Sequence, residues 1–277
     1  MSENIFCAID IGGTKILVYL IDRFRRIRFK QRLATPAGED PEVLVNIVNK
    51  EIGLALQTAK INPRDLCGIG ICIAALVDFH KGIIYQAPNL GWNHPVALKD
   101  IFKRSWSCPV YVENDANAAV QGEVYYGAAR GHHHAIYVTV STGIGGGLFL
   151  DGHIYRGSSG FAGEIGHIKP FGKGRTCGCG GLDCLEAWAS GKGIAGSAGR
   201  WREEERDTAR VFARAEMGHS LARQIIDRAA EDIATGLANL VTVLNPGCLV
   251  LGGTVIAANQ HFFKHIRQRI KKLAIKS

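Results

Sequence analysis

The chain has 277 residues, of which 47% are hydrophobic and 21% are charged, and its formal net charge is +8. This balance excludes a disordered chain, because the apolar side chains are numerous enough to form a core. No apolar run reaches the ~20 residues of a membrane-spanning helix, and Met1–Asn4 lacks the basic segment of a signal peptide. We therefore expect a globular cytoplasmic protein.

The first elements form a strand, a glycine turn and a second strand. The apolar run Ile5–Ile9 ends at Asp10, Gly12-Gly13-Thr14 makes a turn, and Lys15–Ile21 returns as a strand. A helix is expected after Asp40-Pro41, which is an N-cap followed by proline. Further elements are expected downstream: strands at Gly68–Ala74 and Val110–Val112, and a helix from Asn114-Asp115 to about Tyr126.

The same pattern recurs about 130 residues later. Ala135–Val140 is a predicted strand, Ser141–Gly147 a glycine-rich turn, and Leu148–Leu150 a returning strand. An amphipathic helix at Leu221–Leu244 and a strand at Cys248–Leu251, which opens into Gly252-Gly253, complete this half. The repetition predicts a duplicated α/β unit, with an N-terminal lobe at 1–113 and a larger C-terminal lobe at 114–277.

The glycine turns are candidate phosphate sites. Backbone N–H groups beside paired glycines can bind phosphate oxygens, and a hydroxyl or lysine side chain adds a further donor. Asp10 could hold magnesium directly or through water. Neither turn is a Walker A motif, and hairpin geometry alone would explain each turn singly. The candidate nucleotide-binding residues are Asp10, Gly12, Gly13, Thr14, Lys15, Thr142, Gly143, Gly252 and Gly253.

Asp115 is the candidate catalytic base. It stands at the start of a predicted helix, where the helix dipole would keep its carboxylate ionised and therefore only modestly basic. Positioning matters more than basicity in phosphoryl transfer. A plain N-cap is the alternative role.

One histidine and three cysteines make a complete donor set for structural zinc. His167 is followed, after nine residues, by Cys177, Cys179 and Cys184 in a glycine-rich loop. The remaining cysteines lie in apolar segments, as buried thiols of a reducing cytoplasm would.

Two basic runs, Arg23–Arg32 and His265–Lys272, carry much of the positive charge. A basic chain can bind nucleic acid. The first run alternates basic and apolar residues as an exposed strand would, and the second has helical spacing. Solvated faces explain both, so we expect no specific nucleic-acid binding and no membrane binding.

From about residue 5 to 255, the chain resembles ROK-family sugar kinases of the hexokinase–actin-like ATPase superfamily. The resemblance implies an α/β fold of two ribonuclease H-like lobes with a cleft between them. The matching segments are DIGGTK at Asp10–Lys15, PNLGW at Pro88–Trp92, ENDANAA at Glu113–Ala119, STGIGGG at Ser141–Gly147, AGEIGH at Ala162–His167, CGCGGLDCLE at Cys177–Glu186 and NPGCLVLGG at Asn245–Gly253.

The resemblance implies transfer of phosphate from ATP, with Mg²⁺, to the 6-hydroxyl of a hexose, with Asp115 as the base. His167 would contact sugar and also bind structural zinc. A homodimer or larger homo-oligomer is implied as well. The implied sugar contacts are Asn89, Asn114, Glu164, His167 and Glu186.

Three departures from the family pattern are visible. Ala74-Ala75 stands where Pro-Gly is common, and Ser141 and Thr254 stand where glycine is common. Family members usually continue past the position of Ser277 through a further strand and a closing helix, and a chain without that piece is expected to lose stability or activity.

Glucose is the first choice of acceptor, and N-acetylmannosamine, N-acetylglucosamine and fructose remain open. Two other classes also remain: a ROK transcriptional repressor and a catalytically inactive sugar-binding protein. Repressors carry a helix-turn-helix before the first phosphate turn, whereas nine residues precede Asp10 here.

Overall fold

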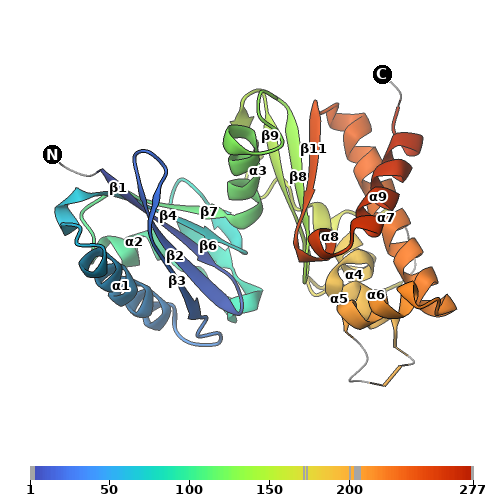
Figure 1. Cartoon of the computed structure of the whole chain (residues 1–277), viewed down its shortest axis with the longest axis horizontal. Helices are drawn as coiled ribbons and strands as arrows, with labels where there is room; N and C mark the ends of the chain where they lie inside the picture. The colour runs from blue at the N-terminus through green and yellow to red at the C-terminus, as the bar shows by residue number, and fades with distance from the viewer. Residues whose placement is uncertain (1–3, 171, 173, 200, 203–206, 276–277) are drawn as a thin grey trace. The chain divides into compact units, whose positions relative to one another are not determined.

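The computed structural model of the chain describes residues 4–170, 172, 174–199, 201–202 and 207–275. The chain divides into two compact units, which are shown in Figure 1 and are described separately below. Unit 1 comprises Met1–Ala118 and Arg156–Phe161, and unit 2 comprises Ala119–Tyr155 and Ala162–Ser277. The lobes predicted from the sequence, 1–113 and 114–277, and the binding roles given to each of them stay a prediction.

Unit 1 is built on a five-stranded sheet in the order β3-β2-β1-β4-β7. β1 pairs with β2 in an antiparallel hairpin, while β4 and β7 run parallel to β1. The strands are β1 (Ile5–Ile11), β2 (Lys15–Asp22), β3 (Ile27–Ala34), β4 (Leu66–Ile73) and β7 (Val110–Asn114), and a separate hairpin joins β5 (Leu76–Asp78) to β6 (Ile83–Gln86).

Helices complete the core of unit 1. The long helix α1 (Pro41–Thr58) begins at Asp40, whose carboxylate accepts from the Glu42 N–H, as the Asp-Pro signal predicts. Its buried side chains, at a helical spacing, join the apolar face of the sheet in one core cluster. The other helical segments of unit 1 are η1 (Pro63–Asp65), η2 (Pro88–Leu90), α2 (Leu98–Lys103) and the first turn of α3 (Asp115–Tyr126).

Unit 2 repeats the strand arrangement in the order β10-β9-β8-β11. β8 and β9 form an antiparallel hairpin, and β11 runs parallel to β8, as β4 does to β1. The predicted duplication is therefore present in the topology. The strands are β8 (Ala135–Val140), β9 (Ile144–Leu150), β10 (His153–Ile154) and β11 (Cys248–Gly252).

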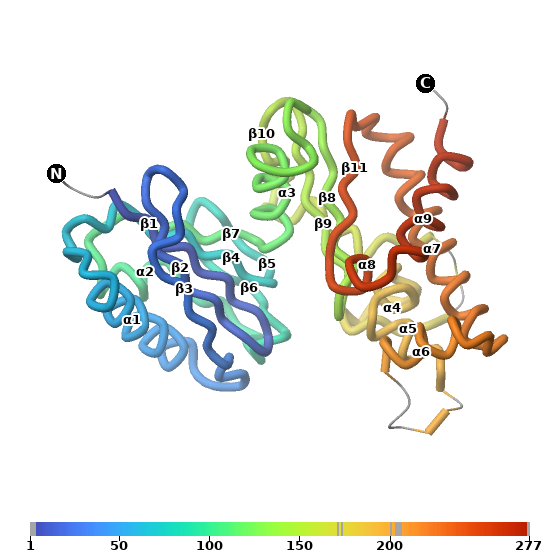
Figure 2. The backbone as a smooth tube through the Cα atoms, viewed as in Figure 1, coloured from blue at the N-terminus to red at the C-terminus, as the bar shows by residue number. Residues whose placement is uncertain are grey.

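Helices α7 (Ser220–Leu244) and α9 (Gln260–Leu273) lie side by side in unit 2, as the tube in Figure 2 shows. α7 ends at Asn245, which adopts a left-handed conformation before Pro246. The shorter helical segments are η3 (Ile165–His167), α4 (Leu185–Ala189), α5 (Gly191–Ser197), α6 (Thr208–Glu216) and α8 (Thr254–Ala258). No helix in the described part of the chain is long and apolar enough to cross a membrane.

The sequence predicts a glycine-rich turn at Ser141–Gly147, and this prediction is wrong for the second half of the segment. β9 begins at Ile144, so the turn ends at Gly143 and the following glycines belong to the strand. A Cβ on Gly146 would lie 2.3 Å from the Ile165 side chain and 2.7 Å from the Gly163 carbonyl oxygen. Glycine is therefore required in the strand because another backbone segment packs closely against it.

Candidate active site

The first glycine turn lies against the segment that carries Asn89. A Cβ on Gly13 would approach the Asn89 Cβ to 2.9 Å, so only glycine fits there. The Gly12 N–H donates to the Lys15 carbonyl, which closes the hairpin. Among the described residues, the N–H groups of Gly13 and Thr14 have no partner, and these two groups could bind phosphate oxygens.

Asp10 and the candidate base Asp115 are electrostatic neighbours at the carboxyl end of the unit 1 sheet. Asp10 pairs in register with Cys72 on β4, and the Cys72 thiol donates to Asp10 Oδ1 at 3.6 Å. Burial raises the pKa of Asp115, and the Asp10 charge raises it further, although the Ala116 N–H opposes this. The expected dipole-stabilised, weakly basic carboxylate is corrected: burial outweighs the helix N-terminus and makes Asp115 a stronger base.

Asn114, not Asp115, caps α3. Its Oδ1 accepts from the N–H groups of Ala116 and Asn117, at 2.9 and 3.1 Å, and its Nδ2 donates to the Ala75 carbonyl at 3.2 Å. These bonds occupy most of the amide, so its main observed role is to fix the strand-to-helix turn that presents Asp115. Capping therefore needs no contribution from the candidate base beyond its own bond to the Ala116 N–H.

The second glycine turn opens into a cavity of about 340 Å³ in unit 2, here called the unit 2 cavity. Ser141 Oγ lies 2.8 Å from Thr254 Oγ1, so this turn meets the residue that follows Gly253. Gly253 has a φ of +92°, and a Cβ there would lie 2.3 Å from the Val140 carbonyl. The cavity is lined by Ser141, Thr142, Gly191, Lys192, Ala195, Asp207, Thr208, Thr254 and Val255.

Sequence reasoning found Thr142 at this cavity and missed Lys192, Asp207 and Thr208. Ser190, which caps α5, marks the start of the helix that carries Lys192, so the sequence places this lysine in the first turn of α5. The sequence does not show that this turn lies at the cavity, because the hydrogen bond from the Lys192 N–H to the Thr142 carbonyl joins residues far apart in the chain. Gly143, Gly252 and Gly253 do not line the cavity themselves and instead shape its backbone.

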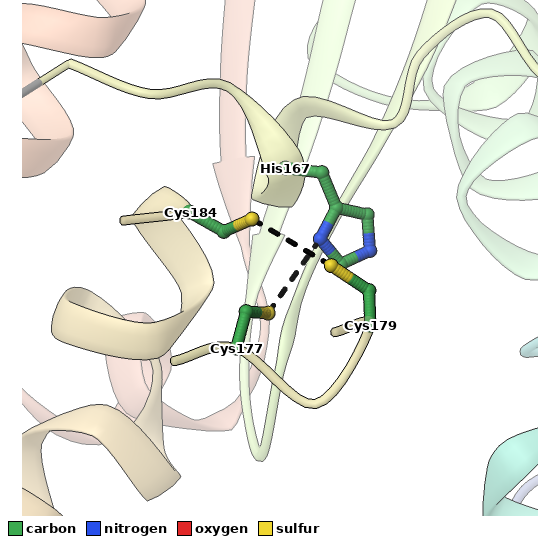
Figure 3. A group of neighbouring side chains, drawn as sticks. All are labelled: His167, Cys177, Cys179 and Cys184. Atoms are coloured by element: carbon green, nitrogen blue, oxygen red, sulfur yellow. Dashed lines mark hydrogen bonds between the residues drawn. The ribbon is translucent and has the colours of Figure 1, made fainter. Parts of the chain in front are cut away.

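His167, Cys177, Cys179 and Cys184 gather as the spacing predicts, and Figure 3 shows their donor atoms pointing toward one another. The four donors lie within 4.8 Å of one another. Cys177 Sγ is 3.8 Å from His167 Nδ1, and Cys179 Sγ is 3.7 Å from Cys184 Sγ. A tetrahedron with Zn–S bonds of about 2.3 Å has edges of about 3.8 Å, so the donor set fits zinc.

The carboxylates at each end of this segment have defined positions. Glu164 Oε2 lies 3.8 Å from His167 Nε2, on the side of the ring opposite the cysteines, an arrangement that orients a metal-binding histidine. Glu186 Oε2 accepts from the Ile144 N–H at 2.9 Å. Glu186 is thus bound to the residue that follows the Thr142-Gly143 turn.

A buried network that the sequence did not reveal holds the cysteine loop. Asp183 is 8% exposed, has a φ of +59°, and accepts from the N–H groups of Gly174 and Arg175 and from Trp188 Nε1. The Arg175 guanidinium lies 4.0 Å from the Trp188 ring centre and donates to the Ala187 carbonyl. The loop is therefore fastened to α4, which carries Glu186.

The structure groups the predicted residues by unit. In unit 1, the first turn lies beside Asn89, and Asp10 lies near Asn114-Asp115. In unit 2, the Thr142-Gly143 turn, Glu186, the Gly252-Gly253 turn and the Cys/His cluster lie in one connected region.

Comparison with known proteins gives consistent matches over nearly the whole chain. A family model described as ROK family matches residues 6–277. The glucokinase of Halalkalibacterium halodurans is 32% identical over 290 residues, which cover 99% of this chain and 88% of that protein. The xylose repressor of Caldicellulosiruptor bescii is 30% identical over 277 residues, which cover 95% of this chain and 69% of the repressor.

A solved structure of comparable sequence identity has a similar fold. A ROK family glucokinase from Streptomyces griseus, in complex with glucose and AMPPNP, superposes with a TM-score of 0.80 and is 30% identical. The superposition covers 99% of this chain and 90% of that one.

Proposed function

The chain belongs to the ROK family and has the actin-like ATPase fold of ROK sugar kinases, and on that premise we propose that it is an ATP-dependent hexose kinase that phosphorylates the 6-hydroxyl of glucose. One observation carries the proposal: the pKa of the half-buried Asp115 carboxyl is raised by desolvation and by the charge of Asp10, at the end of strands that also carry the first glycine turn. The similarity to a glucokinase crystallised with glucose and AMPPNP supports the choice of substrates.

In this mechanism Asp115 accepts the proton of the 6-hydroxyl as the oxygen attacks the γ-phosphorus of ATP, and the bond from that phosphorus to the bridging β-phosphate oxygen breaks, so that ADP leaves. A raised pKa makes its carboxylate a better acceptor at neutral pH than an ordinary aspartate. The bonds of Asn114 to the Ala116 N–H and the Ala75 carbonyl hold the turn, so the carboxylate is oriented before sugar binds.

The nucleotide is assigned to the two turns and the unit 2 cavity. The N–H groups of Gly13 and Thr14 would bind phosphate oxygens, and Thr142 would bind them with its N–H group and hydroxyl. Lys192 adds a cation at the cavity. Asp10 would hold Mg²⁺, which, when bound, neutralises developing charge on the phosphates.

Glu164, His167 and Glu186 are assigned to sugar hydroxyls, with Asn89 as a further contact. We propose that one structural zinc ion binds His167 Nδ1 and the three cysteine thiolates, which leaves no open position for water. Zinc, when bound, supplies a rigid cross-link and no chemistry. The His167 side chain then has Nε2 available on the side of Glu164.

A coupled assay with ATP, Mg²⁺ and a panel of hexoses tests the proposal. We expect glucose to be phosphorylated with a higher kcat/KM than N-acetylmannosamine, N-acetylglucosamine or fructose. Transfer to none of these sugars, with retained glucose binding, would establish the inactive sugar-binding alternative. A different preferred hexose would correct only the substrate.

The similarity to a xylose repressor keeps a second candidate function under test. A DNA-binding repressor would give a sequence-specific footprint that sugar releases. The basic strand β3 and helix α9 predict only weak, salt-sensitive binding to DNA.

We further propose that the protein is cytoplasmic and that it forms a homodimer or larger homo-oligomer. Sedimentation of the purified protein would test the oligomeric state.

A further inference from the structure

A separate cavity of about 590 Å³ lies within unit 1, and none of the site residues assigned above lines it. We call it the unit 1 cavity. Its walls come from the β5–β6 hairpin, from the loop that carries Asn93 and Pro95, and from the segment Arg156–Phe161. The volume is in the range of about 300–1,000 Å³ that is typical of small-molecule sites.

The wall formed by Arg156–Phe161 is held firmly to unit 1. Arg156 makes a salt bridge to the Glu113 carboxylate, with Nε 3.1 Å from Oε2, and its guanidinium lies 4.0 Å from the Phe79 ring centre. Gly160 has a φ of +91°, and a Cβ there would lie 3.3 Å from the Val77 carbonyl. The segment therefore packs backbone to backbone on β5, which fixes this wall of the cavity.

The lining combines aromatic rings with uncommitted polar groups. The rings of Tyr85 and Phe161 meet edge to face, with centroids 5.6 Å apart. Four polar side chains share one property: within the part of the chain that the structure describes, none has a hydrogen-bond partner. They are Gln86, Asn93, Ser158 and Ser159. Amides and hydroxyls both donate and accept, which suits a ligand with several hydroxyl groups on an apolar ring.

The charges exclude an anionic ligand. Asp78 lines the cavity, and its pKa is lowered by the Lys81 N–H, which donates a hydrogen bond to Asp78 Oδ1 at 3.0 Å. Lys81 Nζ lies 3.6 Å from Oδ2, so the carboxylate is already paired. No lysine or arginine is among the described lining residues. A phosphate or carboxylate would meet the Asp78 carboxylate, and the neighbouring Lys81 ammonium is already paired with that carboxylate, whereas a neutral ligand meets no such penalty.

The cavity adjoins the strand end that carries the proposed base. Leu76 lines the cavity, and the carbonyl of the preceding Ala75 accepts from Asn114 Nδ2 at 3.2 Å. Arg156 binds Glu113, the neighbour of Asn114. Two walls of the cavity are thus bonded to the segment that ends in Asp115.

We propose that the unit 1 cavity binds a neutral saccharide ring, additional to the ring whose hydroxyl is phosphorylated. The ring could be the second glycosyl unit of a disaccharide acceptor, or it could be a separate monosaccharide molecule. The first source rests on the proposed kinase function, and the second does not. The binding chemistry is the same: hydrogen bonds to Gln86 and Asn93 and contact with the Tyr85 and Phe161 rings.

Calorimetric titration of the full chain with glucose and with maltose tests the inference. The variant Gln86→Ala/Asn93→Ala removes two amides from the lining, and Gln31→Ala, an exposed glutamine on β3, is the matched control. We expect loss of two hydrogen bonds to weaken binding in the cavity about tenfold. Ser159→Trp, which fills the cavity from an exposed position, should abolish the same binding.

The two sources give different results. For a disaccharide acceptor, maltose binds more tightly than glucose, both variants remove that advantage, and kcat/KM for glucose stays within twofold. For a separate monosaccharide, glucose titrates two sites per chain, and one disappears in both variants. A single glucose site with maltose no tighter, unchanged in both variants, overturns the inference while glucose phosphorylation still supports the kinase. If either binding result holds but no hexose is phosphorylated, the kinase proposal fails and the cavity assignment stands.

Discussion

Replacement of Asp183 by glycine should destabilise the cysteine loop, because the short Asp183 side chain accepts three hydrogen bonds. Asp183 adopts a φ of +59°, which glycine accepts without strain, so the substitution tests the carboxylate alone. Three N–H donors lose their acceptor: those of Gly174 at 2.8 Å, Arg175 at 3.0 Å and Trp188 Nε1 at 3.2 Å.

The magnitude follows from the burial of Asp183, because Gly174 is exposed and Arg175 and Trp188 are half-buried, so water can partly replace the acceptor that their N–H groups lose. At about 0.5–1.5 kcal/mol for each lost hydrogen bond, Asp183→Gly should lower the free energy of unfolding by about 2–4 kcal/mol. Asp183→Asn keeps Oδ1 for Arg175 and Trp188 but turns an N–H group toward Gly174. Asparagine also tolerates the left-handed backbone, so we expect a loss of about 1–2 kcal/mol.

Asp151→Gly is the matched control, because Asp151 also has a positive φ, of +52°, while its side chain is 89% exposed. Urea unfolding followed by circular dichroism gives the three free energies, and the rate of metal release to a chelator reports the loop directly. We expect faster release in Asp183→Gly and no change in Asp151→Gly. Equal shifts in unfolding and release for the two glycine variants would refute the reasoning.

Four further outcomes follow from the site. Asp115→Asn should reduce kcat by ~10²–10⁴-fold with calorimetric glucose affinity retained, and it should raise the free energy of unfolding, since burial disfavours the ionised carboxylate. In the wild type, kcat/KM should fall as the pH drops through the pKa of Asp115, which desolvation raises above that of a free aspartate; a rate that is constant down to pH 4 contradicts this. Elemental analysis should find one zinc per chain, and Cys179→Ser should lose both metal and stability; a metal-free, fully active protein would exclude the site. Gly143→Ala places a Cβ 2.4 Å from Glu186 Oε2 and should raise the KM for sugar, whereas Gly122→Ala, which meets open space, should not.

Local patterns predicted the elements of this fold well, because their causes are local. Asp40-Pro41 fixes the start of α1, and Asn245-Pro246 fixes the end of α7, through bonds within one or two turns. The two hairpins could be recognised as a repeat because alternating apolar residues and a glycine turn recur in each. Their parallel neighbours, β4 and β11, follow the same order.

The properties of the site depended on contacts that no local pattern contains. The helix position of Asp115 suggested a low pKa, but burial and the charge of Asp10, 105 residues away in sequence, raise it. Asp183 has no sequence signal, since an aspartate in a glycine-rich loop is usually a turn residue. The Cys/His cluster was predictable because one histidine and three cysteines at a short spacing are a complete donor set by themselves.

The glycines after the second turn were recognised as a motif, but the role that the sequence suggested for them differs from the one in the structure. They suggested a glycine-rich turn that extends to Gly147, whereas Ile144 already begins β9 and contacts two other segments. Its N–H binds Glu186, and its carbonyl lies where a Cβ on Gly166 would be only 2.1 Å away. Because Gly166 precedes His167, the backbone that carries His167 packs directly on the residue after the Thr142-Gly143 turn. Glycine at 166 therefore sets the distance between the Cys/His cluster and this turn, and the motif is glycine-rich on both sides of that contact for a packing reason.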